Sequence, residues 1–92
     1  MTRLNPNGWR VNGNDTHVIE LVRPIDKGEW EQEVITAEKS IRTGIWNLQI
    51  IEATNGHQIT NTVRNKTFPE DDRDDIITRI NEHVLANPGD QY

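Results

Sequence analysis

The sequence predicts an α+β fold, in which an antiparallel β-meander of four to five strands is followed by one C-terminal α-helix packed on one sheet face. Three observations predict it. Short alternating segments are separated by turn residues along most of the chain. Asn55-Gly56 lies between two of them and is typical of a two-residue hairpin turn, because Asn tolerates a positive φ and Gly adopts it freely. The last quarter has apolar residues at helical spacing. The 92 residues are the size of one domain, 1–92.

Three strands are predicted in the first part of the chain. Turn residues rich in Asn and Gly precede a strand at 9–11. The segment 16–23 has apolar residues on both faces, which favours a central strand. A break around Pro24 separates it from the strand 29–36, whose Glu and Gln residues are poor strand formers. The residues 36–41 are predicted to form one helical turn or a loop.

The next two strands, 44–54 and 57–66, form the predicted hairpin. A two-residue loop sets their register, so that Leu48 opposes Val63 and Ile50 opposes Asn61. The face toward the helix is then expected to carry the apolar side chains of Trp46, Leu48, Ile50, Ile59 and Val63. The reverse face is mostly polar and mildly basic, and its residues include Ile45, Asn47, Gln49, Ile51, Thr60, Thr62, Arg64 and Lys66.

The helix is predicted at 68–86. Thr67 is the expected N-cap, and Glu70 completes a capping box with it. Pro69 fits the first turn, where no hydrogen bond is lost. An apolar stripe faces the sheet, and Asn87-Pro88-Gly89 ends the helix. The stripe consists of Ile76, Ile77, Ile80 and Val84.

Composition narrows the classes of protein that the chain can belong to. It has no cysteine, so disulfides and thiolate metal sites are excluded. No stretch approaches the roughly 18 to 20 apolar residues that span a bilayer, and no signal peptide is visible, so we expect a cytoplasmic protein. The net charge of −5 lies at the C-terminal end: residues 1–66 hold eight basic and eight acidic residues, and residues 67–92 hold two and seven. Such a balance is not typical of a duplex-DNA binder.

The sequence predicts no enzyme, no cofactor and no metal. Ser40 is the only serine and lies in no nucleophile elbow. There is no glycine-rich phosphate loop, and the three histidines show no metal-ligand spacing. The carboxylates crowd on one helical turn and do not face each other across a cleft.

The leading hypothesis is a non-enzymatic protein-binding module, acting as an inhibitor or regulator of the immunity or phage counter-defence type. Its partner would be another protein, such as a basic nucleic-acid-handling enzyme, met by an acidic helix start. Carboxylates in a first turn are also explained by the helix dipole alone. The acidic run consists of Glu70, Asp71, Asp72, Asp74 and Asp75.

Four apolar residues are further candidates for partner contact. Ile45 and Ile51 are expected on the polar sheet face, where they form a small patch for another protein or for a second copy in a homodimer. Trp9 and Trp30 lie near turns and act as half-buried lids or, where exposed, as interface anchors. No membrane contact is expected.

The alternative hypothesis is a small single-stranded nucleic-acid-binding domain, used as a dimer. The order of strands followed by one helix resembles, in topology alone, the single-stranded-DNA-binding domain of a family of transcriptional coactivators. Stacking and backbone contacts would come from the sheet face. That face consists of Asn47, Gln49, Thr60, Thr62, Arg64 and Lys66. A third reading is a structural subunit joined to others by its sheet edges or by Ile45 and Ile51.

Overall fold

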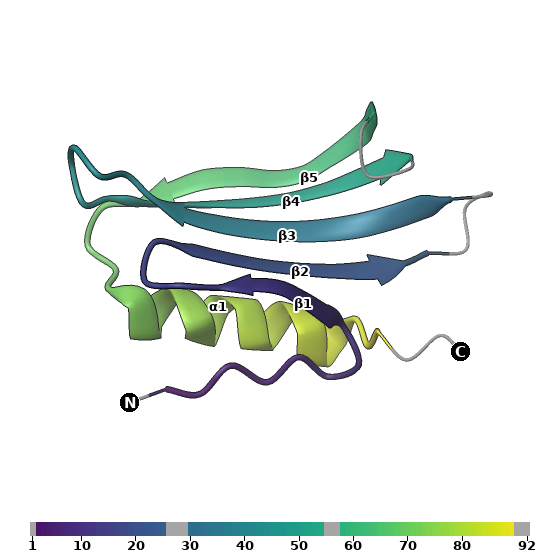
Figure 1. The fold of residues 1–92 in the computed structure, drawn as a ribbon, viewed down its shortest axis with the longest axis horizontal. Helices are drawn as coiled ribbons and strands as arrows, with labels where there is room; N and C mark the ends of the chain where they lie inside the picture. Colours follow the sequence, from purple (N-terminus) through teal and green to yellow (C-terminus); the bar gives the residue numbers. More distant parts are fainter. Residues whose placement is uncertain (1, 26–29, 55–57, 90–92) are drawn as a thin grey trace.

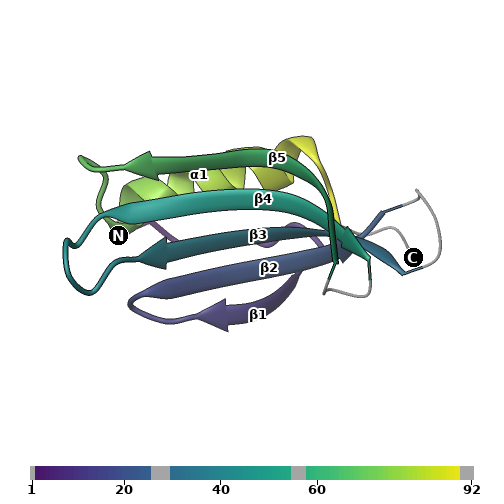
Figure 2. The same cartoon turned by 90° about the horizontal axis from the view of Figure 1, so that it is seen from above.

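In the part of the chain that the structure describes, five antiparallel strands and one C-terminal helix make up the fold (Figure 1). The computed structural model describes residues 2–25, 30–54 and 58–89. The strands follow each other across the sheet in chain order, which confirms the predicted meander (Figure 2). The elements are β1 (Arg10–Asn14), β2 (Val18–Pro24), β3 (Glu31–Lys39), β4 (Trp46–Thr54), β5 (Gln58–Phe68) and α1 (Arg73–Ala86).

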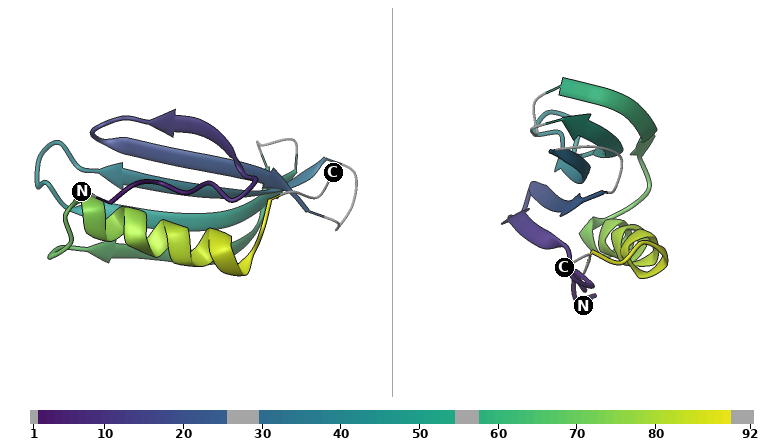
Figure 3. Two further views of the ribbon diagram at one scale, coloured as in Figure 1. Left: turned by 90° about the horizontal axis from the view of Figure 1, so that it is seen from below. Right: turned by 90° about the vertical axis from the view of Figure 1, so that its right-hand side faces the viewer.

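The core lies between α1 and one face of the sheet. Figure 3 shows the helix along that face, with the N-terminal segment alongside it. The predicted helix stripe of Ile76, Ile77, Ile80 and Val84 is buried, as are the sheet residues that alternate toward it. Each fully buried side chain of this kind stabilises the fold by about 1.5–3 kcal/mol. The sheet residues are Ile19, Leu21, Ile35, Ala37, Trp46, Leu48 and Ile50, and Trp9 and Phe68 complete the cluster.

The predicted register of the last hairpin is wrong. Leu48 pairs with Lys66, where the prediction opposed it to Val63, and Ile50 pairs with Arg64, where the prediction opposed it to Asn61. Two irregularities cause the difference, because the register shifts between Ile50 and Ile51 and again between Glu52 and Ala53. At each one β5 contributes an additional residue, as β-bulges do. The predicted turn at Asn55-Gly56 lies outside the described residues.

The shifted register changes which β5 side chains face the helix. Cross-strand partners share a face, so Arg64 and Lys66 lie on the helix side with Ile50 and Leu48. Both were predicted on the reverse face. Ile59 and Val63 were predicted in the core, but they are 53% and 49% exposed.

The helix begins later than predicted. Thr67 pairs with Asn47 in the sheet, and β5 continues to Phe68. Asp72 is the N-cap, its side chain accepting a hydrogen bond from the Asp75 amide at 2.9 Å, while the Asp75 side chain accepts one from the Asp72 amide at 3.0 Å. The capping box therefore lies five residues after the predicted one at Thr67 and Glu70. Likewise, the residues 36–39 belong to β3 and not to the helical turn or loop predicted there.

The opposite face of the sheet is not covered by any described element (Figures 1 and 3). We call it the open face. Both edge strands carry irregularities: β5 at the two places given above, and β1 between Val11 and Gly13. Among the described helices, none is long and apolar enough to cross a membrane.

Candidate functional site

A groove of about 530 Å³ lies on the open face. Strand alternation builds it: Leu21, Ile35 and Ile50 form one row across the sheet toward α1, so the next row points the other way. That next row consists of Val22, Val34 and Ile51, and it gives the groove an apolar floor. The remaining lining residues are Arg10, Asn12, Glu20, Trp30, Gln32 and Thr36.

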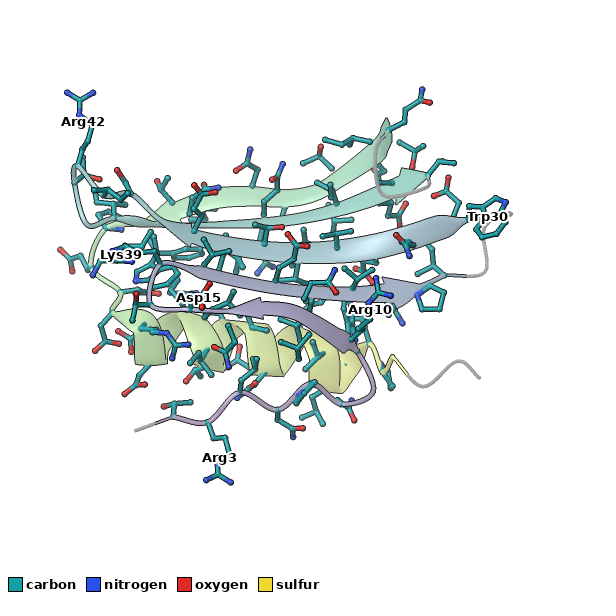
Figure 4. All side chains as sticks on the ribbon, viewed as in Figure 1. Arg3, Arg10, Asp15, Trp30, Lys39 and Arg42 are labelled. Carbon is teal, nitrogen blue, oxygen red and sulfur yellow. The ribbon has the colours of Figure 1, made fainter. Side chains whose placement is uncertain are left out.

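Trp30 stands at one end of this groove. Its side chain is 72% exposed, and Figure 4 shows it at the start of β3, toward the same end of the sheet as Arg10. Its φ of 67° lies in the left-handed region, which costs a non-glycine residue on the order of 1 kcal/mol. An exposed indole in such a backbone conformation fits a role as an interface anchor.

A chain of hydrogen bonds forms one wall of the groove. The Nε of Arg10 donates to Oδ1 of Asn12 at 3.0 Å, and Nδ2 of Asn12 donates to Oε1 of Glu20 at 3.4 Å. A positive and a negative side chain therefore lie on either side of one amide. The groove offers both a cation and an anion to whatever occupies it.

A second hollow, of about 380 Å³, lies where β3 turns into β4. Ile45 contributes to it, whereas Ile51 belongs to the first groove. The two isoleucines are half-buried and lie in separate hollows, so they do not form the single small patch predicted from the sequence. The lining residues are Glu38, Ser40, Thr43, Ile45, Asn47 and Thr67.

Trp9 is not an interface anchor. It is 4% exposed, its Nε1 donates to the Asn87 carbonyl at 2.6 Å, and the Arg23 guanidinium lies 5.1 Å from its ring centre. The position after a turn suggested a lid, but the aromatic ring closes the core beside the end of α1.

Much of the acidic run is engaged within the chain. Asp72 and Asp75 form the capping box, and Asp71 forms an ion pair with Arg79 at 2.6 Å. Glu70 and Asp74 complete the run. The run therefore begins the helix and anchors its first turns, and it offers a partner fewer free carboxylates than its sequence indicates.

The predicted nucleic-acid face is divided between the two sides of the sheet. Asn47 and Gln49 lie on the open face, and Thr62 joins them because it pairs with Ile51. Thr60 lies within hydrogen-bond distance of the Glu52 carbonyl and of Glu31. Arg64 and Lys66 point to the helix side, where Arg64 lines a small hollow of about 220 Å³ with Arg79, Glu82 and His83.

Sequence reasoning missed a polar cluster beside the core. Glu33 is 5% exposed, and its carboxylate lies 2.7 Å from both Nε and Nη2 of Arg23 and 3.0 Å from Nε2 of His83. Burial raises the pKa of Glu33, but the hydrogen bonds from His83 and Arg23, together with the charge of Arg23, outweigh it and hold that pKa below its ordinary value. No spacing connects these residues, since His83 is 50 positions away from Glu33. Within residues 2–25, 30–54 and 58–89, no cluster of His, Asp or Glu could hold a metal ion.

No protein-family model, curated protein or solved structure matches this chain.

Proposed function

We propose that this chain is a non-enzymatic protein-binding module that docks on another protein chain through its open sheet face. One observation carries the proposal: an apolar groove floor of Val22, Val34 and Ile51 lies beside the exposed Trp30 on a sheet face that nothing described covers. Interface centres are enriched in aromatic residues and depleted in charged ones.

The charge distribution supports docking through the open face. On β1 to β4 the charged side chains of the open face are those of Arg10, Glu20 and Glu38, among residues that the structure describes. The chain as a whole has 27% charged residues and a net charge of −5. The open face therefore has few charges that are nearly balanced in sign, and it is easier to desolvate than the rest of the surface.

The acidic helix start is a weaker docking surface than the sequence suggests. Asp71, Asp72 and Asp75 already have partners in the chain. A partner that took these carboxylates would have to replace the capping interactions of α1, each worth about 1 kcal/mol. Docking on the open face would leave the cap of α1 intact.

Single-stranded nucleic acid is the second candidate ligand. The observation that favours it is the position of Arg10 and Trp30 at one groove, where a cation could meet phosphate and an indole could stack on a base. Glu20 lies in the same groove, and Arg64 and Lys66 point to the other side of the sheet. The charge pattern therefore favours a protein.

The test compares the two faces of the sheet by photo-crosslinking in a lysate of the source organism. A benzophenone amino acid at Gln49 probes the open face, and the same probe at the exposed Arg64 is the matched control on the helix side. We expect a protein adduct at Gln49 that falls at least about tenfold in a Trp30→Ala background, because hot-spot aromatics carry much of the binding energy. The adduct should be unchanged in Glu70→Gln.

Three results would contradict the proposal. One is an adduct at Gln49 that survives Trp30→Ala. Another is a stronger adduct at Arg64 than at Gln49. The third is a low-salt complex with a single-stranded oligonucleotide that Arg10→Glu abolishes, which would favour the nucleic-acid reading.

A further inference from the structure

We infer that the protein which occupies the open face is a second copy of this chain, related to the first by a two-fold axis. The inference rests on the proposed function, since it names the partner of the same surface. In a two-fold dimer one patch must complement itself, so it has to carry both halves of every match. The open face carries both halves of one charge pair, Arg10 and Glu20, and it carries both the exposed indole of Trp30 and a second hollow.

The charge match follows from the sheet register. The row Arg10, Val22, Val34 and Ile51 and the row Glu20, Thr36 and Gln49 both belong to the open face. Between them lies the row of Leu21, Ile35 and Ile50, which points toward α1. A two-fold axis that crosses the strands at this middle row exchanges the other two rows. Arg10 of each copy then comes within reach of Glu20 of the other.

The shape match follows from the same axis. Trp30 precedes Ile35 by five residues, and Ser40 follows Ile35 by five. The rotation that exchanges the two rows therefore carries Trp30 of one copy over Ser40 and Ile45 of the other. Those residues line the second hollow, of about 380 Å³. One axis thus accounts for the charge pair, the exposed indole and the hollow that receives it.

The sheet edges offer no equally good contact. β1 and β5 both carry register shifts, and bulges blunt an edge for pairing with another strand. The helix side of the sheet is filled by α1. Face-to-face association places two sheets about 10 Å apart with interdigitating side chains, which gives a small domain a larger shared core.

The decisive experiment is a charge swap, read by sedimentation equilibrium over micromolar to millimolar concentrations. We expect a dimer that Arg10→Glu and Glu20→Arg each weaken at least about tenfold, because each places like charges together. The chain that carries both substitutions should return to within about threefold of the parent, because the opposite charges face each other again. Arg64→Glu, on the other face, is the matched control and should have no effect. Circular dichroism confirms that each variant is folded.

A second measurement uses the absence of cysteine from the chain. Gln32 and Glu38 lie three residues on either side of Ile35, so the axis brings Gln32 of one copy opposite Glu38 of the other. Within one chain they are about 20 Å apart, which is too far for a short thiol cross-linker to span. A short bis-maleimide cross-linker should join the variant with both Gln32→Cys and Glu38→Cys into a closed dimer, because facing sheets lie about 10 Å apart, and it should not join Gln32→Cys alone.

Several outcomes overturn the inference. They are a monomeric mass at every concentration, a dimer that Arg10→Glu leaves intact, a double swap that restores nothing, and a ladder of cross-linked oligomers. A monomer whose Gln49 probe still captures another protein in a Trp30-dependent way overturns the inference and leaves the proposed function standing. A monomer with no such adduct overturns both.

Discussion

Glu33 connects parts of the chain that are far apart in sequence. Its carboxylate pairs with Arg23 of β2 and with His83 of α1. Arg23 also donates a hydrogen bond to the Pro88 carbonyl at 2.8 Å. A buried carboxylate without partners would be strongly destabilising. Here the partners satisfy it, so the cluster holds the end of the helix to the sheet.

The Glu33 cluster predicts a pH dependence of stability. The folded-state pKa of Glu33 lies below its ordinary value of 4.5, so the ionised carboxylate stabilises the fold at pH values above 4.5. That contribution is lost as the pH falls below 4.5 and passes through the folded-state pKa. Glu33→Gln should lower the free energy of unfolding by about 2 kcal/mol at neutral pH, and it should reduce the further loss of stability at acid pH. Urea unfolding between neutral and acid pH measures both effects.

The control for this experiment is Glu70→Gln, which removes a carboxylate from an exposed position. It should change the free energy of unfolding by less than about 0.5 kcal/mol. A Glu33→Gln chain with the same free energy of unfolding as the parent, and the same pH dependence, would show that the cluster contributes nothing to stability.

Among the elements, α1 shows how two sequence signals compete for one helix start. Thr67 and Glu70 match a capping box, and so do Asp72 and Asp75. The sheet decides between them, because Thr67 pairs with Asn47 and cannot leave β5 to cap a helix. The helix therefore begins after the strand has ended.

This choice predicts different costs at the two candidate caps. Asp72→Ala removes the acceptor of the Asp75 amide and should lower the free energy of unfolding by about 1 kcal/mol. Thr67→Ala, at an exposed strand position, should cost less than about 0.5 kcal/mol. Chemical denaturation of the two variants makes the comparison. Equal costs, or a larger cost at Thr67, would be inconsistent with the cap at Asp72.

At the scale of the molecule, the N-terminal segment is tied to the end of α1. Asn7 donates to the Val84 carbonyl at 2.7 Å, and the Gly89 amide donates to the Asn7 carbonyl at 3.0 Å. Gly89 lies so close to this segment that a Cβ there would be 2.5 Å from the Trp9 backbone nitrogen. The two segments pack as backbone against backbone.

Gly89→Ala should therefore push the N-terminal segment around Trp9 away from the end of α1. We expect a loss of about 2 kcal/mol of stability, since overpacking against a backbone atom cannot be relieved by a side-chain rotation. Gly13→Ala is the matched control, because its nearest contact would be an ordinary 3.9 Å. Thermal unfolding followed by tryptophan fluorescence measures both. A Gly89→Ala melting curve like that of Gly13→Ala would refute the close packing.

The sequence predicted the faces of the β4 side chains better than those of the β5 side chains. On β4 strict alternation assigned Leu48 and Ile50 to the core and Asn47 and Gln49 to the reverse face, and the pairing of β4 with β3 is regular. On β5 the alternation was read through two bulges, so Arg64 was placed on the wrong side. A bulge has no clear signature in a strand of Asn, Thr and Arg, since none of these residues requires it.

The sequence by itself determined the strand order, the helix and its buried stripe, because hydrophobic periodicity and turn chemistry are local properties of the chain. Only the tertiary structure decided the face on which Arg64 and Lys66 lie, the helix cap at Asp72, the burial of Trp9 and the cluster at Glu33. Each of these depends on which distant residues meet, and a one-residue slip in a strand moves every side chain to the other face. The tertiary structure also decided the groove on the open face, because β1 to β4 each contribute residues to it.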